Sequence, residues 1–118
     1  MPLDEFKENI KKMVKNSAVQ AHDTRIIVVT APPVDEYQLW VADEARGRSQ
    51  PSRTAERTKS YADAAREAGD ELGAAVLDVW TLFMTKAGWE PGKPLPGSRE
   101  IVQSSVLRDL LHDGILHV

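Results

Sequence analysis

The sequence predicts an α/β fold in which a short parallel sheet is flanked by helices, and three observations support this prediction. Two apolar segments, residues 25–30 and 74–80, have the composition of strands that are buried on both faces of a parallel sheet. Residues 54–72 have helical periodicity and separate the two segments, which gives the order of a βαβ unit. The 118 residues are enough for one domain, which we expect to span residues 1–118.

An amphipathic helix is expected first, over residues 2–17. Acidic residues come early and lysines late in this segment, which matches the charges that the helix dipole favours. Its apolar residues recur at steps of three and four: Leu3, Phe6, Ile10, Met13 and Val14.

Stop and start signals follow the first strand. Pro32 and Pro33 end it, because proline cannot donate a hydrogen bond to a sheet. Residues 43–53 are polar and contain a glycine and a proline, so they predict a loop. Thr54 is the expected N-cap of the long helix, and Gly73 is placed to end it.

The last third of the chain is predicted to be less regular. We expect a turn or short helix through Lys86 and a loop over residues 89–97, which are rich in proline and glycine. A last helix is expected to begin at a cap on Ser98 and to run to about Leu111.

Composition narrows the classes of function. The net charge of -3 argues against a nucleic-acid-binding protein, which usually carries a basic excess. The absence of cysteine excludes disulfides, cysteine-based zinc sites and cysteine nucleophiles, and we expect neither a metal nor a cofactor. The longest apolar run, residues 26–29, is too short to span a membrane, and no signal-peptide pattern is present. A cytoplasmic location is therefore expected.

Five segments resemble, in order, the isoamyl-acetate-hydrolysing branch of the SGNH, or GDSL, esterases. Residues 2–9 resemble the helix after the third conserved block, and residues 26–33 resemble the fourth strand with its proline turn. Residues 57–64 resemble the next helix, residues 71–81 the last strand, and residues 110–117 the block with the catalytic acid and histidine. The resemblance implies a truncated SGNH domain of flavodoxin-like, three-layer architecture, corresponding to the C-terminal half of such an esterase.

The resemblance also implies a catalytic pair, Asp113 and His117. The family spacing is Asp-X-X-His, and this pair has one extra residue, whereas Asp109 and His112 have the family spacing. Asp113 is favoured because Gly114 follows it, as in the family motif. The Gly-Asp-Ser nucleophile motif and the two blocks with oxyanion-hole residues are absent, and they would lie before Met1.

An acid–base pair without a serine nucleophile predicts an enzyme that acts on an acyl or ester-like small molecule. Ring closure, in which the substrate supplies its own hydroxyl or enol nucleophile and forms a lactone or pyrone, is the most concrete reaction. The alternatives are a non-catalytic pseudo-hydrolase that binds a ligand or partner, and a fragment of a complete esterase.

Residues for substrate binding are predicted at a strand end and on two tryptophans. Thr30, Pro32 and Pro33 follow a parallel strand at its carboxyl end, where α/β sheets bind ligands. Trp40 and Trp89 are candidates for the wall of an acyl pocket, whereas core packing is the simpler role for Trp80. A basic cluster is either a solvated loop or meets an anionic group: Arg46, Arg48, Arg53 and Arg57.

Two strands make about half of a doubly wound sheet. Half a sheet leaves a strand edge and an apolar face uncovered, and such edges pair readily with another chain. We therefore predict a homodimer, since two-fold symmetry is the commonest arrangement of soluble oligomers. The alternative is a separate chain that supplies the N-terminal half.

Overall fold

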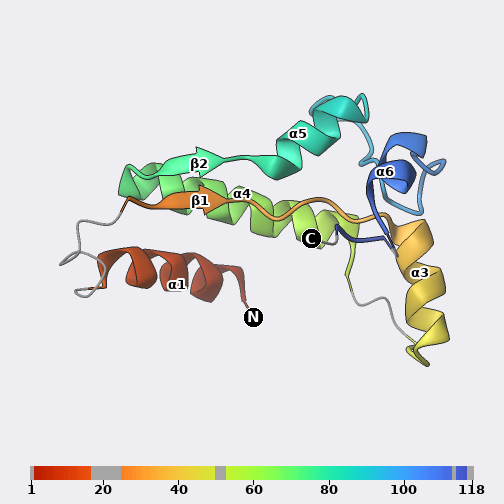
Figure 1. Cartoon of the computed structure of the whole chain (residues 1–118), viewed down its shortest axis with the longest axis horizontal. Helices are drawn as coiled ribbons and strands as arrows, with labels where there is room; N and C mark the ends of the chain where they lie inside the picture. The colour runs from red at the N-terminus through yellow and green to blue at the C-terminus, as the bar shows by residue number, and fades with distance from the viewer. Residues whose placement is uncertain (1, 17–24, 50–52, 113, 117–118) are drawn as a thin grey trace.

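The computed structural model describes residues 2–16, 25–49, 53–112 and 114–116. In these residues, five helices and a two-stranded parallel sheet confirm the predicted α/β class (Figure 1). The order along the chain is α1 (Leu3–Lys15), β1 (Ile27–Val29), α3 (Glu36–Ala45), α4 (Ala55–Leu72), β2 (Ala75–Leu77), α5 (Val79–Lys86) and α6 (Ser105–Leu110).

Helix α4 covers one face of the sheet. The two strands run parallel, with Val28 opposite Val76, and these two valines face the helix. A β-carbon added at Gly69 would lie 2.5 Å from Cγ2 of Val76, so the helix and the sheet approach closely only because this residue is glycine. The helix face toward the sheet and core is made of small buried residues: Ala62, Ala65, Ala68 and Gly69.

The opposite face of the sheet is open, so the prediction that both strands are buried on both faces is wrong for this chain alone. Ile27 is 63% exposed, Val29 is 54% exposed and Leu77 is 48% exposed. Successive strand residues point to opposite faces, and Figure 1 shows α4 behind the two strands with no described helix in front of them. The radius of gyration, 15.9 Å, exceeds the roughly 13.5 Å expected for a filled domain of this length.

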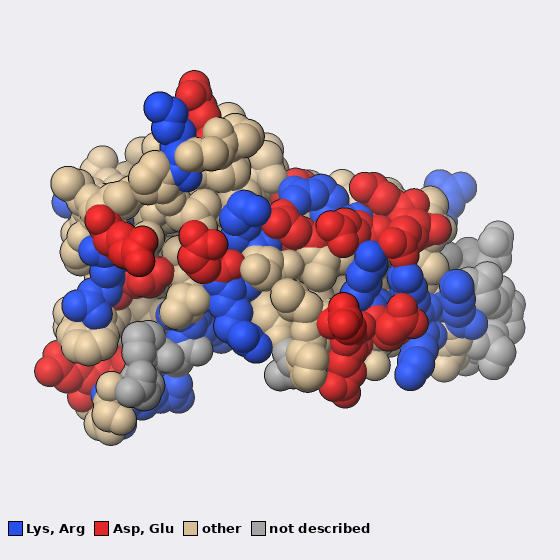
Figure 2. Space-filling view, turned by 180° about the vertical axis from the view of Figure 1, so that it is seen from behind, with Lys and Arg blue, Asp and Glu red and all other residues tan. Residues whose placement is uncertain are grey.

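Ion pairs hold α1 along α4. Lys7 Nζ lies 3.3 Å from Glu67 Oε2 and 2.8 Å from Glu71 Oε1, and Lys11 also pairs with Glu71. Hydrogen bonds from Lys11 and Lys7 lower the pKa of Glu71 to about 2 against the opposing effect of desolvation. Seen from behind, acidic and basic side chains alternate over these two helices (Figure 2).

The predicted apolar stripe of α1 is only half-buried. Phe6 packs edge-to-face on Tyr61, with ring centroids 4.9 Å apart. No residue of α1 is fully buried, and Met13 is 63% exposed. The first helix therefore forms where its periodicity predicts, but α4 covers only part of the stripe.

Helix α3 is not among the predicted elements, and it includes residues 43–45 of the predicted loop. Asp35 caps it, since its Oδ1 accepts a hydrogen bond from the Tyr37 N–H at 3.1 Å. Leu39 is buried, whereas Val41 is 65% exposed. The apolar residues thus do not form one stripe, and no helical periodicity marks the segment.

Two further boundaries differ from the predictions. The last helix begins at Ser105 with Ser104 as its N-cap, because Ser98 instead lies in a turn where its Oγ accepts from the Glu100 N–H. The second strand ends at Leu77, because Asp78 caps α5 and turns the chain into a helix. The predicted caps of α4 are confirmed: Thr54 accepts from the Arg57 N–H at 3.2 Å, and Gly73 has a left-handed backbone.

A hydrophobic core lies at the carboxyl end of the sheet, between α4, α5 and α6. Trp80 is 2% exposed there, which confirms its predicted role in packing. The buried members of the cluster are Ala55, Ala62, Trp80, Met84, Leu95, Leu107 and Leu111.

Candidate functional site

An open hollow of about 610 Å³ lies at the carboxyl end of β1. Its walls come from α1, from the exit of β1, from the start of α4 and from the C-terminal segment. In α/β sheets, ligands bind outside the carboxyl ends of the strands, so this is the position where the architecture predicts a site. The lining residues are Phe6, Ala31, Pro32, Pro33, Val34, Arg53, Thr54, Arg57, Thr58, Tyr61, Ile115 and Leu116.

Gly114 docks the C-terminal segment beside this hollow. Its carbonyl oxygen accepts a hydrogen bond from the Asp35 N–H at 2.9 Å. Its φ is +85°, and a β-carbon there would lie 2.5 Å from the Asp35 carbonyl oxygen and 2.6 Å from the Leu39 nitrogen. Only glycine fits such a backbone and such a contact. His112 and Ile115 exchange backbone hydrogen bonds of 2.9 and 3.0 Å, which fix the turn around the glycine.

The predicted catalytic residues, Asp113 and His117, lie outside the described residues. Ile115 and Leu116 stand between them in the sequence, and both line the hollow. In Figure 1 the C-terminal segment runs back to the exit of β1 and the start of α4. Residues 115 and 116 therefore lie at the carboxyl edge of the sheet.

The alternative pair, Asp109 and His112, does not line this hollow. Asp109 is exposed and pairs with Arg108, whose Nε lies 3.2 Å from Asp109 Oδ1. His112 is exposed and lines a different open hollow, together with Tyr37 and Gln103. His112 thus lies outside the hollow that Ile115 and Leu116 line, so mutation can distinguish the two candidate pairs.

Of the five predicted substrate-binding residues, only Pro32 and Pro33 line the hollow beside the C-terminal segment. Trp40 lies on α3, where the Arg99 guanidinium carbon is 4.1 Å from its ring centroid. Trp89 packs edge-to-face on Trp80, and its Nε1–H donates to the Lys93 carbonyl at 3.0 Å.

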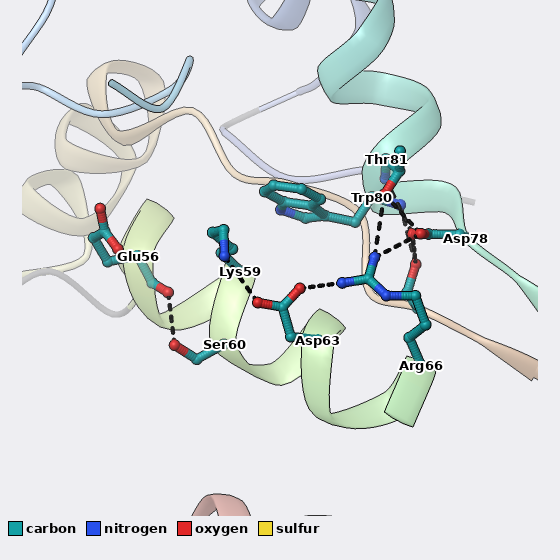
Figure 3. A network of polar contacts seen from close by, with 9 residues as sticks. Glu56, Lys59, Ser60, Asp63, Arg66, Asp78, Trp80 and Thr81 are labelled. Carbon is teal, nitrogen blue, oxygen red and sulfur yellow. Dashed lines mark hydrogen bonds and ion pairs between the residues drawn. The ribbon is translucent and has the colours of Figure 1, made fainter. Parts of the chain in front are cut away.

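Thr30, the fifth of these residues, is buried and belongs to a polar network around Asp78. Figure 3 shows Arg66 and Thr81 of this network beside Asp78. Its Oγ1 donates to Asp78 Oδ1 at 3.0 Å and accepts from the Trp80 N–H at 3.1 Å. Thr81 donates to both carboxylate oxygens, from its N–H at 3.1 Å and from its hydroxyl at 2.6 Å. Arg66 Nη1 adds a bond of 2.7 Å to Oδ2. Each oxygen of Asp78 thus accepts two hydrogen bonds.

This network joins the sheet to α4 and α5 rather than offering a proton acceptor. Burial would raise the pKa of Asp78, but hydrogen bonds from Thr81 and Arg66 outweigh burial and hold the pKa at about 2. Arg66 also pairs with Asp63, whose other oxygen lies 2.9 Å from Lys59 Nζ. Asp78 is therefore ionised at neutral pH with its oxygens occupied, and its role is structural.

Several lining residues were not predicted as part of a site, notably Phe6, Thr58 and Tyr61. The sequence places each on the apolar or small face of a helix, which indicates packing rather than ligand binding. These residues meet at the hollow only because α1 lies along α4. The sequence contains no signal for that pairing beyond the two stripes.

Comparison with known proteins indicates a family relationship. The chain is 33% identical over 90 residues to GDSL esterase/lipase CPRD49 from Arabidopsis thaliana, covering 76% of this chain and 35% of that protein. It is 31% identical over 122 residues to a second GDSL esterase/lipase of the same plant, covering 98% of this chain and 51% of that protein. The chain is a distant homologue of part of the GDSL esterases. No family model matches it.

The bovine relative carries the name that the resemblance predicted. The isoamyl acetate-hydrolyzing esterase 1 homolog of Bos taurus is 32% identical over 84 residues, which are 70% of this chain and 33% of that protein. The chain thus spans between about one third and one half of the length of these three curated relatives. With the α/β architecture, this homology implies a fragment of an SGNH fold.

The described part of the chain has no helix with both the length and the apolar character needed to cross a membrane. Within the same ranges, no group of three histidine, aspartate or glutamate side chains is arranged to hold a metal ion.

Proposed function

We propose that this chain acts on a small acyl or ester-type substrate, which binds in the hollow at the carboxyl end of β1, with Asp113 and His117 as the acid–base pair. The docking of residues 114–116 through Gly114 supports this proposal most strongly, because Ile115 and Leu116, which follow Asp113 and precede His117 in the sequence, line the same hollow as Pro32 and Pro33. Homology to GDSL esterases supports the ester class of the substrate.

The proposed chemistry is proton transfer by the histidine. Neutral His117 takes the proton from an attacking hydroxyl, and Asp113 orients the imidazole and stabilises its protonated form. The same proton then passes to the leaving oxygen or sulfur as the acyl bond breaks. Such assistance is worth about 10²–10⁴-fold in rate.

Ring closure is the most concrete reaction for the residues that the chain provides. The sequence has no Gly-Asp-Ser motif and no Gly-X-Asn-Asp motif, so no serine in it is placed as the family nucleophile. In ring closure, a hydroxyl or enol oxygen of the substrate attacks its own ester or thioester carbon. A lactone or pyrone forms, and an alcohol or thiol leaves with the proton.

A second candidate is a pseudo-hydrolase that binds an acyl ligand or a partner without transforming it. A third arrangement is a complete esterase of which these residues form one part. All three candidates use the same hollow, and they differ in turnover and in the source of the nucleophile.

The test compares the two candidate pairs by mutation. Hydroxyacyl thioesters are offered to wild type, to His117→Ala and Asp113→Asn, and to the matched controls His112→Ala and Asp109→Asn. We expect His117→Ala to lose about 10²–10⁴-fold in the rate of lactone formation and Asp113→Asn to lose less. The controls should behave like wild type.

Three outcomes separate the candidates. Binding of the thioester without turnover would indicate the pseudo-hydrolase. Loss of activity in the His112 and Asp109 variants instead would move the site to the other surface. Robust hydrolysis of p-nitrophenyl esters that a serine-reactive phosphonate abolishes would contradict catalysis without a serine nucleophile.

A further inference from the structure

The hollow at the carboxyl end of β1 has an apolar floor and one cationic side. The exit of β1 and the C-terminal segment contribute the floor, through residues 31–34 and 115–116. The start of α4 and the residues just before it contribute the polar side, including Arg57 and Arg53. Among the described residues, these two arginines are the only charged residues of the lining, and no aspartate or glutamate balances them there.

Arg57 is held at the edge of the hollow by an aromatic wall. Its guanidinium carbon lies 5.3 Å from the ring centroid of Tyr61, and its Nη2 donates to the Tyr61 hydroxyl at 3.2 Å. Tyr61 in turn packs edge-to-face on Phe6, and both rings line the hollow. A cation over an aromatic face is attracted to it, so the guanidinium is positioned before any ligand binds.

The two arginines differ in their partners from those lysines and arginines of the described ranges that form ion pairs. Six other lysines and arginines pair with carboxylates: Lys7, Lys11, Arg48, Lys59, Arg66 and Arg108. In the described ranges, neither Arg53 nor Arg57 has a carboxylate partner. A guanidinium binds carboxylate or phosphate oxygens in a two-pronged geometry, so an oxyanion is the ligand group that this side fits.

We infer that the hollow binds an acyl compound that carries an oxyanion, which names the substrate class of the proposed function and depends on it. The apolar chain lies along residues 32–34 and Leu116, and the oxyanion meets Arg57 and Arg53. The volume of about 610 Å³ is in the range of roughly 300–1,000 Å³ that is typical of small-molecule sites. Both arginines are exposed, so salt should weaken the ion pair.

Calorimetric binding of three probes to the whole chain tests the inference. Decanoate, decyl phosphate and decanol share one alkyl chain and differ in the head group. We expect at least one of the two anions to bind about tenfold more tightly than decanol, and the advantage should fall in high salt. The tighter anion identifies the oxyanion as a carboxylate or a phosphate.

Variants then assign the advantage to residues. Arg57→Gln should remove most of the advantage of the anions over decanol. Arg57→Lys should keep part of this advantage, because lysine keeps the charge but lacks the two-pronged guanidinium. Arg53→Gln is a second variant, since its exposed side chain has no hydrogen-bond or ion-pair partner among the described residues whose loss could unfold the protein. Arg108→Gln, an exposed arginine on α6, is the matched control and should bind the anions like wild type.

Equal binding of decanol and both anions would overturn the inference and leave the acyl hollow intact. An anion advantage that survives in both Arg57→Gln and Arg53→Gln would also overturn it. If none of the three probes binds, the hollow is not an acyl site, and the proposed function then fails together with the inference.

Discussion

The two faces of the sheet have similar sequences but different surroundings. Val28 and Val76 point at α4, where Gly69 allows contact close enough that one added carbon would overlap. Ile27, Val29 and Leu77 point the other way and are each about half exposed or more. The strand composition therefore fits a three-layer fold, but these residues build only two of the layers, the sheet and the helix on its covered face.

The largest loss of stability is expected from a substitution on the covered face of the sheet. Gly69→Val places three carbons against Val76 and Val28 and should destabilise the chain by about 3 kcal/mol, near the upper end of the usual cost of overpacking. Ala75→Val adds two methyl groups on the open face of β2 and is the matched control. Because valine favours strands and the added groups find space, we expect little change or a small gain. Denaturant unfolding of both variants measures the contrast, and equal costs would contradict the difference between the faces.

A smaller effect is expected from the polar network, which ties the strand ends to the covered side through Arg66 of α4. The side chain of Asp78 is 25% exposed, and its pKa is held at about 2 instead of its ordinary 3.8. That difference corresponds to about 2 kcal/mol, so Asp78→Asn should lower the free energy of unfolding by about 2 kcal/mol. Asp70→Asn, an exposed position on α4, is the control and should change the stability by less than about 0.5 kcal/mol.

The same carboxylate predicts an acid dependence of stability. Between pH 3.8 and about 2, Asp78 binds a proton in the unfolded chain but not in the folded one. Its contribution is therefore complete above about pH 4 and is lost as the pH falls through about 2. Unfolding measured from pH 5 downward should show the gap between wild type and Asp78→Asn closing. Glu71 contributes to the acid slope of both proteins, so it cancels in the comparison. A gap that stays constant with pH would contradict the assignment.

The extent to which the fold could be predicted depends on whether local signals agree with the packing. Thr54 and Gly73 bound α4 as predicted, because a cap and a left-handed glycine act within one turn of the chain. Helix α3 was not predicted. Its N-cap, Asp35, is a local signal, but the helix start is buried by contacts with residues far away in the sequence, such as Gly97 and Gly114. The open sheet face was missed for a similar reason, since composition does not show which layers the chain itself supplies.

The candidate site, too, was predictable where local signals mark it and not where distant segments meet. The resemblance singled out Gly114 as the mark of the acid–histidine block, and the structure shows a physical need for glycine there. Pro32 and Pro33 could be predicted because they end a parallel strand. Arg57 appeared only as a member of a basic cluster, because its place beside Tyr61 and Phe6 depends on how α1 lies on α4.

The smallest effect on the stability of the single chain is expected at the open face, and there the predicted homodimer can be tested. Ile27→Thr with Leu77→Thr replaces two exposed apolar side chains by β-branched polar ones, so each change should cost the monomer about 0.5 kcal/mol or less. If a second copy covers this face, wild type should sediment as a dimer at micromolar concentration and the double variant as a monomer. The stability of wild type should then rise with concentration, because association stabilises only the folded chain. Val102→Thr changes an equally apolar residue that is 88% exposed outside the sheet, and it should leave the dimer intact. A wild-type monomer that is stable and well folded would show that α4 alone is enough to support the sheet, and the contrast between its two faces would then carry no consequence for assembly.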